Sequence, residues 1–373
     1  MSLSIGIVGL PNVGKSTLFN ALTDSGVLAA NYPFATIEPN SGIVPVPDER
    51  LDVLAKMYKS QKVIPATVEF VDIAGLVAGA SKGEGLGNKF LANIRETDAI
   101  CHVVRAFPSE KILRSDEKVV GDDQIVEFAK NDIEIIEMEL AFADISSIEN
   151  HLPKVAKTMK SDPKNAAKET AFLTSAQNIL MSGDFAKSNE FFAKLSDEDR
   201  VFAKNLNLFS LKPRIYLFNV SENDLTREDR KTELSNLVSP AKSVFVCAEL
   251  ESEIREMDEM DAAELLADYG VEDSGLKILA KTAYETLGLQ SYLTAGEKET
   301  RAWTIKIGAT APEAAGVIHT DFQKGFIAAQ IVSYGDLTAA GSEKSARESG
   351  KMRTEGKTYV MQDGDVVEFR FNV

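Results

Sequence analysis

Cysteine, tryptophan and long apolar runs are all scarce in this chain of 373 residues. The two cysteines, Cys101 and Cys247, each lie inside an apolar, strand-like run, so we expect buried thiols and neither a disulfide nor a cysteine-based metal site. No window approaches about 18 uninterrupted apolar residues, and no basic segment followed by a long apolar one opens the chain. These absences predict a cytoplasmic protein without a membrane span.

Positive charge is also in short supply. Lysine and arginine number 41 against 57 aspartates and glutamates, which gives a formal net charge of −16. The long-range field of such a chain repels phosphates, so a generic nucleic-acid coat and a basic membrane-surface protein are both disfavoured. We therefore expect no DNA or membrane partner, and any contact with RNA must be local.

The pattern along the chain predicts an α/β protein with one insertion and one additional domain. Short β-branched runs alternate with helical stretches over residues 1–125, and the same style returns over 206–278, which is typical of a parallel-rich sheet that is interrupted and then resumed. Residues 279–373 instead contain strand-like runs around an Asp-Gly turn, in "KTYVMQDGDVVEFRFNV", and predict a small α+β module.

The interruption at residues 126–205 is rich in helical periodicity. Pro163, in "KSDPKN", predicts a turn before a second helix. Apolar residues at steps of three and four mark a seam on each predicted helix: Ala141, Ile145, Ile148, Leu152 and Val155, then Leu173, Ala176 and Leu180. We expect an inserted antiparallel helical hairpin that buries its own seam.

A phosphate-binding loop follows the first strand-like run. "GLPNVGKS", Gly9 to Ser16, fills the pattern G-x-x-x-x-G-K-[ST] between an apolar run and the helical "TLFNAL". Glycines let backbone amides curl around phosphate oxygens, Lys15 reaches the β- and γ-phosphates, and the Ser16 hydroxyl is a Mg²⁺ ligand. The residues predicted to contact the nucleotide here are Asn12, Val13, Gly14, Lys15, Ser16 and Thr17.

Two further segments complete the predicted phosphate and metal site. "VEFVDIAG" ends a strand with Asp72-x-x-Gly75, where the carboxylate holds Mg²⁺ and the glycine amide senses the γ-phosphate. Thr36, between Pro33 and Pro39, supplies a hydroxyl that completes the metal shell and closes over the γ-phosphate, while its alternative role is to begin a strand. Lys15, Thr36 and Gly75 are the predicted catalytic residues, and Ser16, Thr36 and Asp72 the predicted metal ligands.

The residue after Gly75 is Leu76, where many GTPases have the glutamine that orients the attacking water. An apolar side chain cannot orient water, so we expect slow intrinsic hydrolysis. Glycines at 79, 83, 85 and 87 follow, in a segment with little reason to hold one conformation without a ligand.

The base site is predicted at "YLFNVSEND", where Asn-Val-Ser-Glu replaces the guanine-reading Asn-Lys-x-Asp. In that motif the aspartate accepts hydrogen bonds from guanine N1–H and the 2-amino group, and the lysine stem packs over the site. Val220 has no ammonium, and Glu222 is one methylene longer. Because adenine presents a lone pair at N1, we expect adenine to be read by Asn219 and by backbone groups near Val220.

Taken together, these motifs resemble the Obg-like ATPase (YchF) family over essentially the whole chain. The matching segments include "GLPNVGKSTLFNALT", "FVDIAGLVAGASKGEGLGNKFL", "NVSE" and "IKIGATAPEAAGVIHTDFQKGFIAAQIV". The resemblance implies a P-loop domain related to Obg, a helical coiled-coil insertion and a carboxyl-terminal TGS domain of the β-grasp type. It also implies hydrolysis of ATP in preference to GTP with Mg²⁺, and association with ribosomes.

The resemblance also assigns individual residues. Asn12 matches the loop asparagine that accompanies potassium activation in related GTPases, and Ala248 lies in a segment similar to the Ser-Ala-Lys loop that contacts the base. Some family members have a histidine in the loop that here contains Arg114, a charge-stabilising substitute or simply a solvated residue. None of His102, His151 and His319 fills that position.

Three readings of the function remain open from the sequence. The first is a slow ATPase whose nucleotide state controls docking of the helical and TGS domains on a ribosome. The alternatives are a GTPase of the Obg group with unusual base contacts, and a nucleotide-gated adaptor in which hydrolysis only resets the state. The run "KSARESGKMRTEGK" is either a contact for ribosomal RNA or a solvated loop.

Overall fold

The computed structural model describes residues 3–23, 40–73, 86–108 and 121–372. The contacts between residues divide the chain into two compact units. Among the described residues, the first unit holds those up to 42 and those from 70 to 276, and the second holds 43–69 and 277–372.

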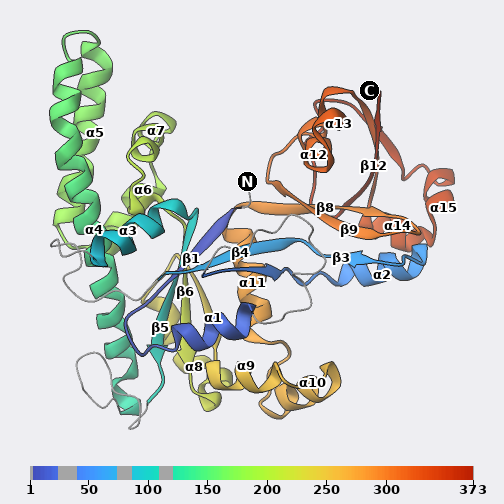
Figure 1. Ribbon diagram of the computed structural model, residues 1–373, viewed down its shortest axis with the longest axis horizontal. Helices are drawn as coiled ribbons and strands as arrows, with labels where there is room; N and C mark the ends of the chain where they lie inside the picture. Colours follow the sequence, from blue (N-terminus) through green and yellow to red (C-terminus); the bar gives the residue numbers. More distant parts are fainter. Residues whose placement is uncertain (1–2, 24–39, 74–85, 109–120, 373) are drawn as a thin grey trace. The chain divides into compact units, whose positions relative to one another are not determined.

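A six-stranded sheet forms the centre of the first unit (Figure 1). Its order is β2 (Ser41–Pro45), β4 (Thr67–Asp72), β1 (Ser4–Val8), β5 (Ala99–Ala106), β6 (Arg214–Val220) and β7 (Lys242–Val246). The pairs β1–β5, β5–β6 and β6–β7 are parallel. Their carboxyl ends therefore lie along one edge of the sheet, where ligands bind in folds of this kind.

Helices connect and cover these strands. The helices of the first unit outside the insertion are α1 (Lys15–Thr23), α3 (Leu86–Glu96), α8 (Glu228–Asn236), α9 (Ala248–Ile254) and α10 (Glu259–Asp268). Short 3-10 turns lie at η3 (Asp122–Gln124), η4 (Phe209–Leu211) and η5 (Glu222–Thr226). The boundary between the two units falls within α11 (Gly275–Thr286).

The predicted helical hairpin is confirmed. It is formed by α4 (Ile125–Thr158) and α5 (Pro163–Met181), which lie side by side in Figure 1, followed by α6 (Phe185–Ala193) and α7 (Asp197–Asn205). Pro163 is the first residue of α5, and Asp162 caps that helix. The predicted seam residues share one core cluster, in which Leu152 is partly buried and the others are buried.

The second unit contains a separate six-stranded sheet. Its order is β11 (Arg353–Glu355), β10 (Phe326–Ser333), β12 (Asp365–Phe371), β8 (Leu289–Ala295), β9 (Thr300–Lys306) and β3 (Val63–Ile64). Its helices are α2 (Glu49–Tyr58), α12 (Ala311–Ile318), α13 (Thr320–Lys324), α14 (Tyr334–Ala340) and α15 (Glu343–Glu348). The expected α/β architecture, with a parallel-rich sheet, a helical hairpin and a carboxyl-terminal sheet domain, is thus confirmed.

One expected strand is wrong. The run before the Asp363-Gly364 turn forms a single bridge, between Val360 and Thr310, and only β12 after the turn is a strand. The physical reason is that β12 already lies between β10 and β8, so the preceding run has no free edge to join.

Residues 46–66, which lie between β2 and β4, belong to the second unit, although the rest of that unit begins only at residue 277. Strand β3 pairs in parallel with β9, Arg50 forms an ion pair with Asp363 at 2.7 Å, and the Ser60 hydroxyl donates to the Gly296 carbonyl at 2.7 Å. The division of the chain at residues 125, 205 and 278 remains a proposal, and it places this segment within the first nucleotide-binding part.

No helix in the described ranges is long and apolar enough to cross a membrane.

Candidate functional site

The phosphate loop connects β1 to α1 at the carboxyl edge of the sheet. Gly14 has φ +92°, a backbone conformation that residues with a side chain rarely adopt. A Cβ there would lie 2.3 Å from Asn219 Nδ2. Helix α1 starts immediately afterwards, with the Leu18 amide donating to the Gly14 carbonyl at 3.0 Å. The glycine that the pattern requires is therefore needed both for backbone conformation and for space, and the loop delivers a helix N-terminus to the site.

Lys15 and Asp72 meet at this edge, although they are far apart in sequence. The Lys15 ammonium donates a hydrogen bond to the Asp72 carboxylate, and the side chains are only 10% and 21% exposed. Asp72 is the last residue of β4, the strand beside β1, and its amide is held by the Asn40 carbonyl at 2.7 Å. The predicted phosphate-binding cation and the predicted metal-binding carboxylate are thus brought together.

These groups suit a magnesium ion. Asp72 and the exposed Ser16 offer hard oxygen donors, and the described residues contain no cluster of three or more His, Cys, Asp or Glu side chains that could hold a metal alone. Mg²⁺ usually keeps several waters and binds through one or two protein oxygens together with substrate phosphates. The Lys15 ammonium supplies the positive charge beside Asp72 in this structure. With nucleotide bound, Lys15 would contact the phosphates and Asp72 would contact Mg²⁺.

Asn219 connects the phosphate loop to the base loop. Its Nδ2 donates to the Val13 carbonyl at 3.0 Å, and its Oδ1 accepts from the Ala248 amide at 3.1 Å. The side chain is buried, and both of these hydrogen bonds are buried too. Asn219 therefore holds Val13 and Ala248 in register, a positioning role that the sequence does not reveal.

The two departures from the guanine motif have different surroundings. Val220 is only 2% exposed and packs in a core cluster together with Phe218 and Cys247, so its side chain points away from solvent. Glu222 begins η5 and lies beside the Tyr269 hydroxyl, and its carboxylate is the main reason that the pKa of Tyr269 is raised. The base end thus carries a carboxylate beside a tyrosine and no lysine stem.

Several predicted residues lie outside the described ranges. These are Thr36, Gly75, Leu76 and Arg114, together with most of the glycine-containing segment that follows Leu76. Their roles remain predictions from the sequence.

The histidines lie in ordinary structural surroundings. Burial lowers the pKa of His102 to about 3, so this ring is neutral inside β5. His151 contacts Glu169 at 2.9 Å between α4 and α5, and His319 Nδ1 accepts from the Asp321 amide at the start of α13.

Helix α4 reaches the core beneath the base loop. Ile125, Ala129 and Ile133 at its beginning pack in the same cluster as Val220 and Cys247. One turn later, buried Glu137 forms an ion pair with Arg214 at 3.1 Å and accepts from the Tyr216 hydroxyl at 2.8 Å.

Farther along α4, Asp144 accepts hydrogen bonds from the Phe209 and Ser210 amides and from the Ser210 hydroxyl. Burial raises the pKa of Asp144 to about 6 in spite of these donors. Buried polar groups of this kind fix one arrangement because breaking them leaves an unpaired partner. The base of the hairpin is therefore firmly attached to the sheet that carries the nucleotide site.

The basic run in the second unit is balanced by acidic partners. Ion pairs form between Arg347 and Glu343 at 3.1 Å, Lys344 and Glu348 at 3.9 Å, Lys351 and Asp336 at 3.1 Å, and Arg353 and Glu355 at 3.8 Å. This pattern favours the solvated alternative for "KSARESGKMRTEGK".

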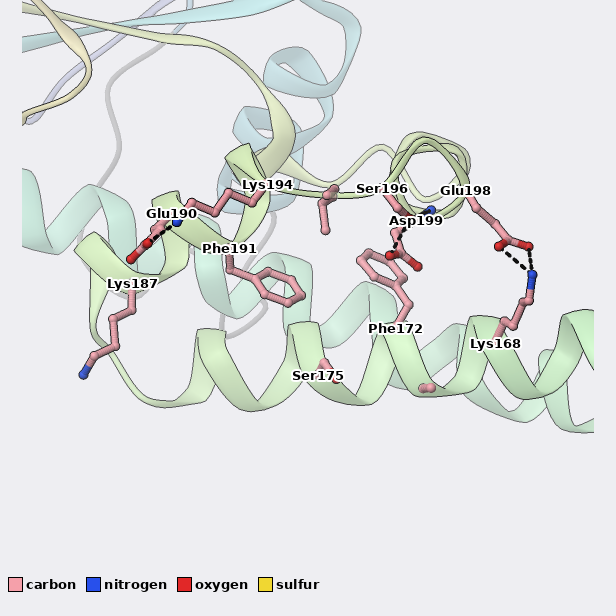
Figure 2. Close-up of a pocket in the computed structure, with 12 residues that line it drawn as sticks. Lys168, Phe172, Ser175, Lys187, Glu190, Phe191, Lys194, Ser196, Glu198 and Asp199 are labelled. Carbon is pink, nitrogen blue, oxygen red and sulfur yellow. Dashed lines mark hydrogen bonds and ion pairs between the residues drawn. The ribbon is translucent and has the colours of Figure 1, made fainter.

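A cavity of about 730 Å³ opens within the helical insertion, between α5, α6 and α7 (Figure 2). Phe172 and Phe191 form its apolar floor, and two ion pairs, Lys168 with Glu198 and Lys194 with Glu190, lie at its rim. Its lining contains none of the predicted nucleotide contacts.

Comparison with protein-family models gives two matches. A model described as "50S ribosome-binding GTPase" matches residues 4–143, and a model named YchF-GTPase_C, described as "Protein of unknown function (DUF933)", matches residues 289–372.

Relatives align with the chain from end to end. Proteins named Ribosome-binding ATPase YchF from Haemophilus influenzae and Bacillus subtilis are 50% and 48% identical to it, with all of each chain covered. A solved structure, "Structure of the Schizosaccharomyces pombe YchF GTPase", superposes with a TM-score of 0.85 at 37% identity, covering 99% of this chain and 98% of that one. These names agree on the kind of protein and differ on the nucleotide.

Proposed function

The chain belongs to the YchF family, and from this premise we propose that it binds ATP with Mg²⁺ and hydrolyses it to ADP and phosphate in preference to GTP. The observation that carries the choice of ATP is the base end of the site. There, the guanine-reading Asn-Lys-x-Asp is replaced by Asn219-Val220-Ser221-Glu222, with Val220 buried in the core and Glu222 beside Tyr269.

Discrimination follows from hydrogen-bond matching. A carboxylate is an acceptor only, so it pairs with the N1–H and 2-amino group of guanine and has no partner on adenine N1. A site that rejects GTP needs its carboxylate kept from that position, and the neighbouring Tyr269 hydroxyl offers Glu222 another partner. Leaving a guanine donor unpaired in a buried site costs about 1–3 kcal/mol, which is enough for a clear preference.

The phosphate end supports hydrolysis chemistry without choosing the base. The loop amides at the start of α1 and the Lys15 ammonium would hold the triphosphate, and Ser16 and Asp72 would hold Mg²⁺, joined by Thr36. Bound there, Mg²⁺ would neutralise the charge on the β- and γ-phosphates. With Leu76 in place of the water-orienting glutamine, intrinsic turnover is slow, and Asn12 is the residue through which K⁺ would act.

The same proposal extends to the partner. The relatives are named for ribosome binding, and we place this chain on ribosomes in the cytoplasm as a nucleotide-dependent switch. The helical insertion and the carboxyl-terminal domain, for which we propose the TGS type, would make the contacts. Firm attachment of α4 to the sheet supports a link between nucleotide state and docking.

A GTPase is the second candidate, because the family model over residues 4–143 and the fission-yeast structure are both described with that word. Single-turnover hydrolysis of equal concentrations of ATP and GTP, with Mg²⁺ and in sodium or potassium buffer, distinguishes the two candidates. Faster cleavage of ATP is expected. Equal or faster cleavage of GTP would overturn the proposal, and cleavage of neither in the presence of ribosomes would favour the adaptor reading.

A further inference from the structure

The tip of the helical hairpin is strongly basic in an acidic protein. Between residues 154 and 168 the sequence contains five lysines, one aspartate and no other charged residue, which gives a local formal charge of +4 against −16 for the whole chain. This segment comprises the end of α4, the turn and the beginning of α5. Positive charge, which is in the minority in this chain, is thus concentrated at the tip of the hairpin.

The lysines at the tip lack acidic partners among the described residues. Lys154, Lys157, Lys160 and Lys164 are exposed and have no ion pair there, whereas Lys168 is paired with Glu198 at 2.7 Å. The one carboxylate within residues 154–168, on Asp162, is engaged by the amide and the side chain of Asn165, at 3.3 and 2.7 Å. The positive charge at the tip is therefore available to a partner.

Four other exposed lysines show the opposite arrangement, although Lys62, Lys204, Lys306 and Lys357 are also exposed without an ion pair in the described part of the chain. Lys130, Lys187, Lys194 and Lys344 lie 3.8, 2.8, 2.5 and 3.9 Å from Glu134, Asp184, Glu190 and Glu348, respectively. Most surface ion pairs contribute little to stability, but they do cancel the local field. The tip keeps its field because its lysines have no such neighbours.

The hairpin presents these lysines on two helices that pack against each other. Lys154 and Lys157 project from the last turns of α4, Lys160 lies in the turn, and Lys164 projects from the first turn of α5. Helix α4 is continuous for 34 residues, about 50 Å, from the core beneath the base loop to this tip. Below the tip, the inward faces of both helices are filled by the hairpin's own core.

We propose that the tip, defined by Lys154, Lys157, Lys160 and Lys164, binds the phosphate backbone of double-stranded RNA. Four exposed ammonium groups of one sign match a polyanion, and a narrow two-helix tip brings them together in the way that phosphate-directed, sequence-independent contacts require. The apolar seams of α4 and α5 are buried within the hairpin, and Met159 is the one large apolar side chain exposed between residues 154 and 168, which is little for insertion into a lipid layer. The inference rests on the proposed ribosome association and identifies its surface as the hairpin tip.

The test compares two full-length variants that remove the same four charges. The first is K154Q/K157Q/K160Q/K164Q at the tip, and the matched control is K130Q/K187Q/K194Q/K344Q, whose lysines already have acidic partners. Binding is measured to a synthetic RNA duplex, to purified ribosomes and to phosphatidylglycerol vesicles over a series of salt concentrations. Circular dichroism and ATP hydrolysis without ribosomes report whether each variant is folded and active.

The tip variant is expected to lose about tenfold or more in affinity for the duplex and for ribosomes. Its slope of log affinity against log salt should fall by about 3, while the control variant changes affinity by less than about twofold. Equal losses in the two variants, or an unchanged tip variant, would overturn the inference, as would binding of the tip to vesicles in preference to RNA.

The two proposals fail in different ways. If wild-type protein binds ribosomes and the tip variant binds them equally well, the tip assignment is wrong and the proposed function stands. If wild-type protein does not bind ribosomes, the partner in the proposed function is wrong, and the duplex arm still decides whether the tip binds RNA.

Discussion

The phosphate end and the base end of the candidate nucleotide site have diverged to different degrees from a guanine-binding protein. At the phosphate end the sequence keeps the full loop pattern, and Lys15 lies against Asp72. At the base end it keeps Asn219 and changes both residues that complete guanine recognition. All nucleoside triphosphates carry the same phosphates, so selection for a different base acts at one end of the site only.

The two ends share one connecting residue. Asn219 bonds Val13 on one side and Ala248 on the other, so the geometry of the phosphate loop depends on the loop that contacts the base. Substitutions can therefore be chosen to affect the phosphate end, the base end or the connection between them.

Lys15→Ala should have the largest effect, and the effect should be independent of the base. The substitution removes the ammonium of the phosphate loop, where hydrogen bonds to charged groups are worth about 1.5–3 kcal/mol, or about 10- to 100-fold in affinity. Titration calorimetry should show similar losses for ATP, GTP and inorganic tripolyphosphate. Near-normal ATP affinity would remove Lys15 from the site.

Asn219→Ala should weaken the connection and so lower affinity at both ends. Two buried hydrogen bonds are lost, which leaves the Ala248 amide and the Val13 carbonyl without their partner, at a cost of about 1–3 kcal/mol each. ATP and tripolyphosphate should both bind less tightly, and chemical denaturation should show a lower free energy of unfolding. The exposed Asn223, in η5 just after β6, supplies the control, as Asn223→Ala. Loss of ATP binding with unchanged tripolyphosphate binding would show that Asn219 acts on the base alone.

Rebuilding Asn-Lys-x-Asp by Val220→Lys with Glu222→Asp should move the preference toward GTP. A tenfold gain in relative GTP affinity requires only about 1.4 kcal/mol. Tripolyphosphate affinity should not change, because the phosphate loop is untouched. An ATP/GTP ratio that stays constant would place the choice of base elsewhere, for example at Ala248.

The burial of Val220 makes its own control necessary. At 2% exposure, a lysine there must leave the core or disturb it, so thermal unfolding of Val220→Lys alone measures that penalty. Glu222→Asp alone leaves the core intact and isolates the effect of the carboxylate.

The sequence was sufficient where the chemistry is local or periodic. The phosphate loop needs a glycine at position 14 for backbone reasons that no other residue satisfies, and the hairpin seam follows helical periodicity, so both were predictable. Asp72 was predictable as well, because parallel strands place their carboxyl ends along one edge.

The sequence was insufficient where a side chain finds a distant partner. The reading of adenine by Asn219 stays a prediction, whereas the bonds of its side chain to two backbone groups, one of them 206 residues away, were not predicted. No sequence pattern predicts the contact of Tyr269 with Glu222 or the pairing of β3 with β9. The unpaired lysines at the hairpin tip are visible in the sequence, but their lack of acidic neighbours is a property of the fold.

Leu76→Ala should have the smallest effect, because an apolar side chain does not orient the attacking water. Single-turnover ATP hydrolysis by the isolated variant should stay within about threefold of wild type, because neither leucine nor alanine orients the attacking water.

Ribosomes should accelerate wild-type hydrolysis by ordering Thr36 and the glycine-containing segment after Leu76 around the γ-phosphate. An electrostatic group added at the γ-phosphate raises the rate on the order of 10³–10⁵-fold, so the effect should be measurable. The same single-turnover assay with added ribosomes, in sodium and in potassium buffers, measures this effect. Fast turnover by the isolated protein, unchanged by ribosomes or by potassium, would show that the water-orienting group already lies in this chain.

The contrast between the two ends is tested most directly by equilibrium affinities of the wild-type protein for ATP, GTP and tripolyphosphate in the presence of Mg²⁺. The account predicts that ATP binds about tenfold or more tightly than GTP, and that GTP gains little over tripolyphosphate because guanine finds no matching acceptor. Equal affinities for ATP and GTP, or tighter binding of GTP, would contradict it and show that Glu222 still reads guanine.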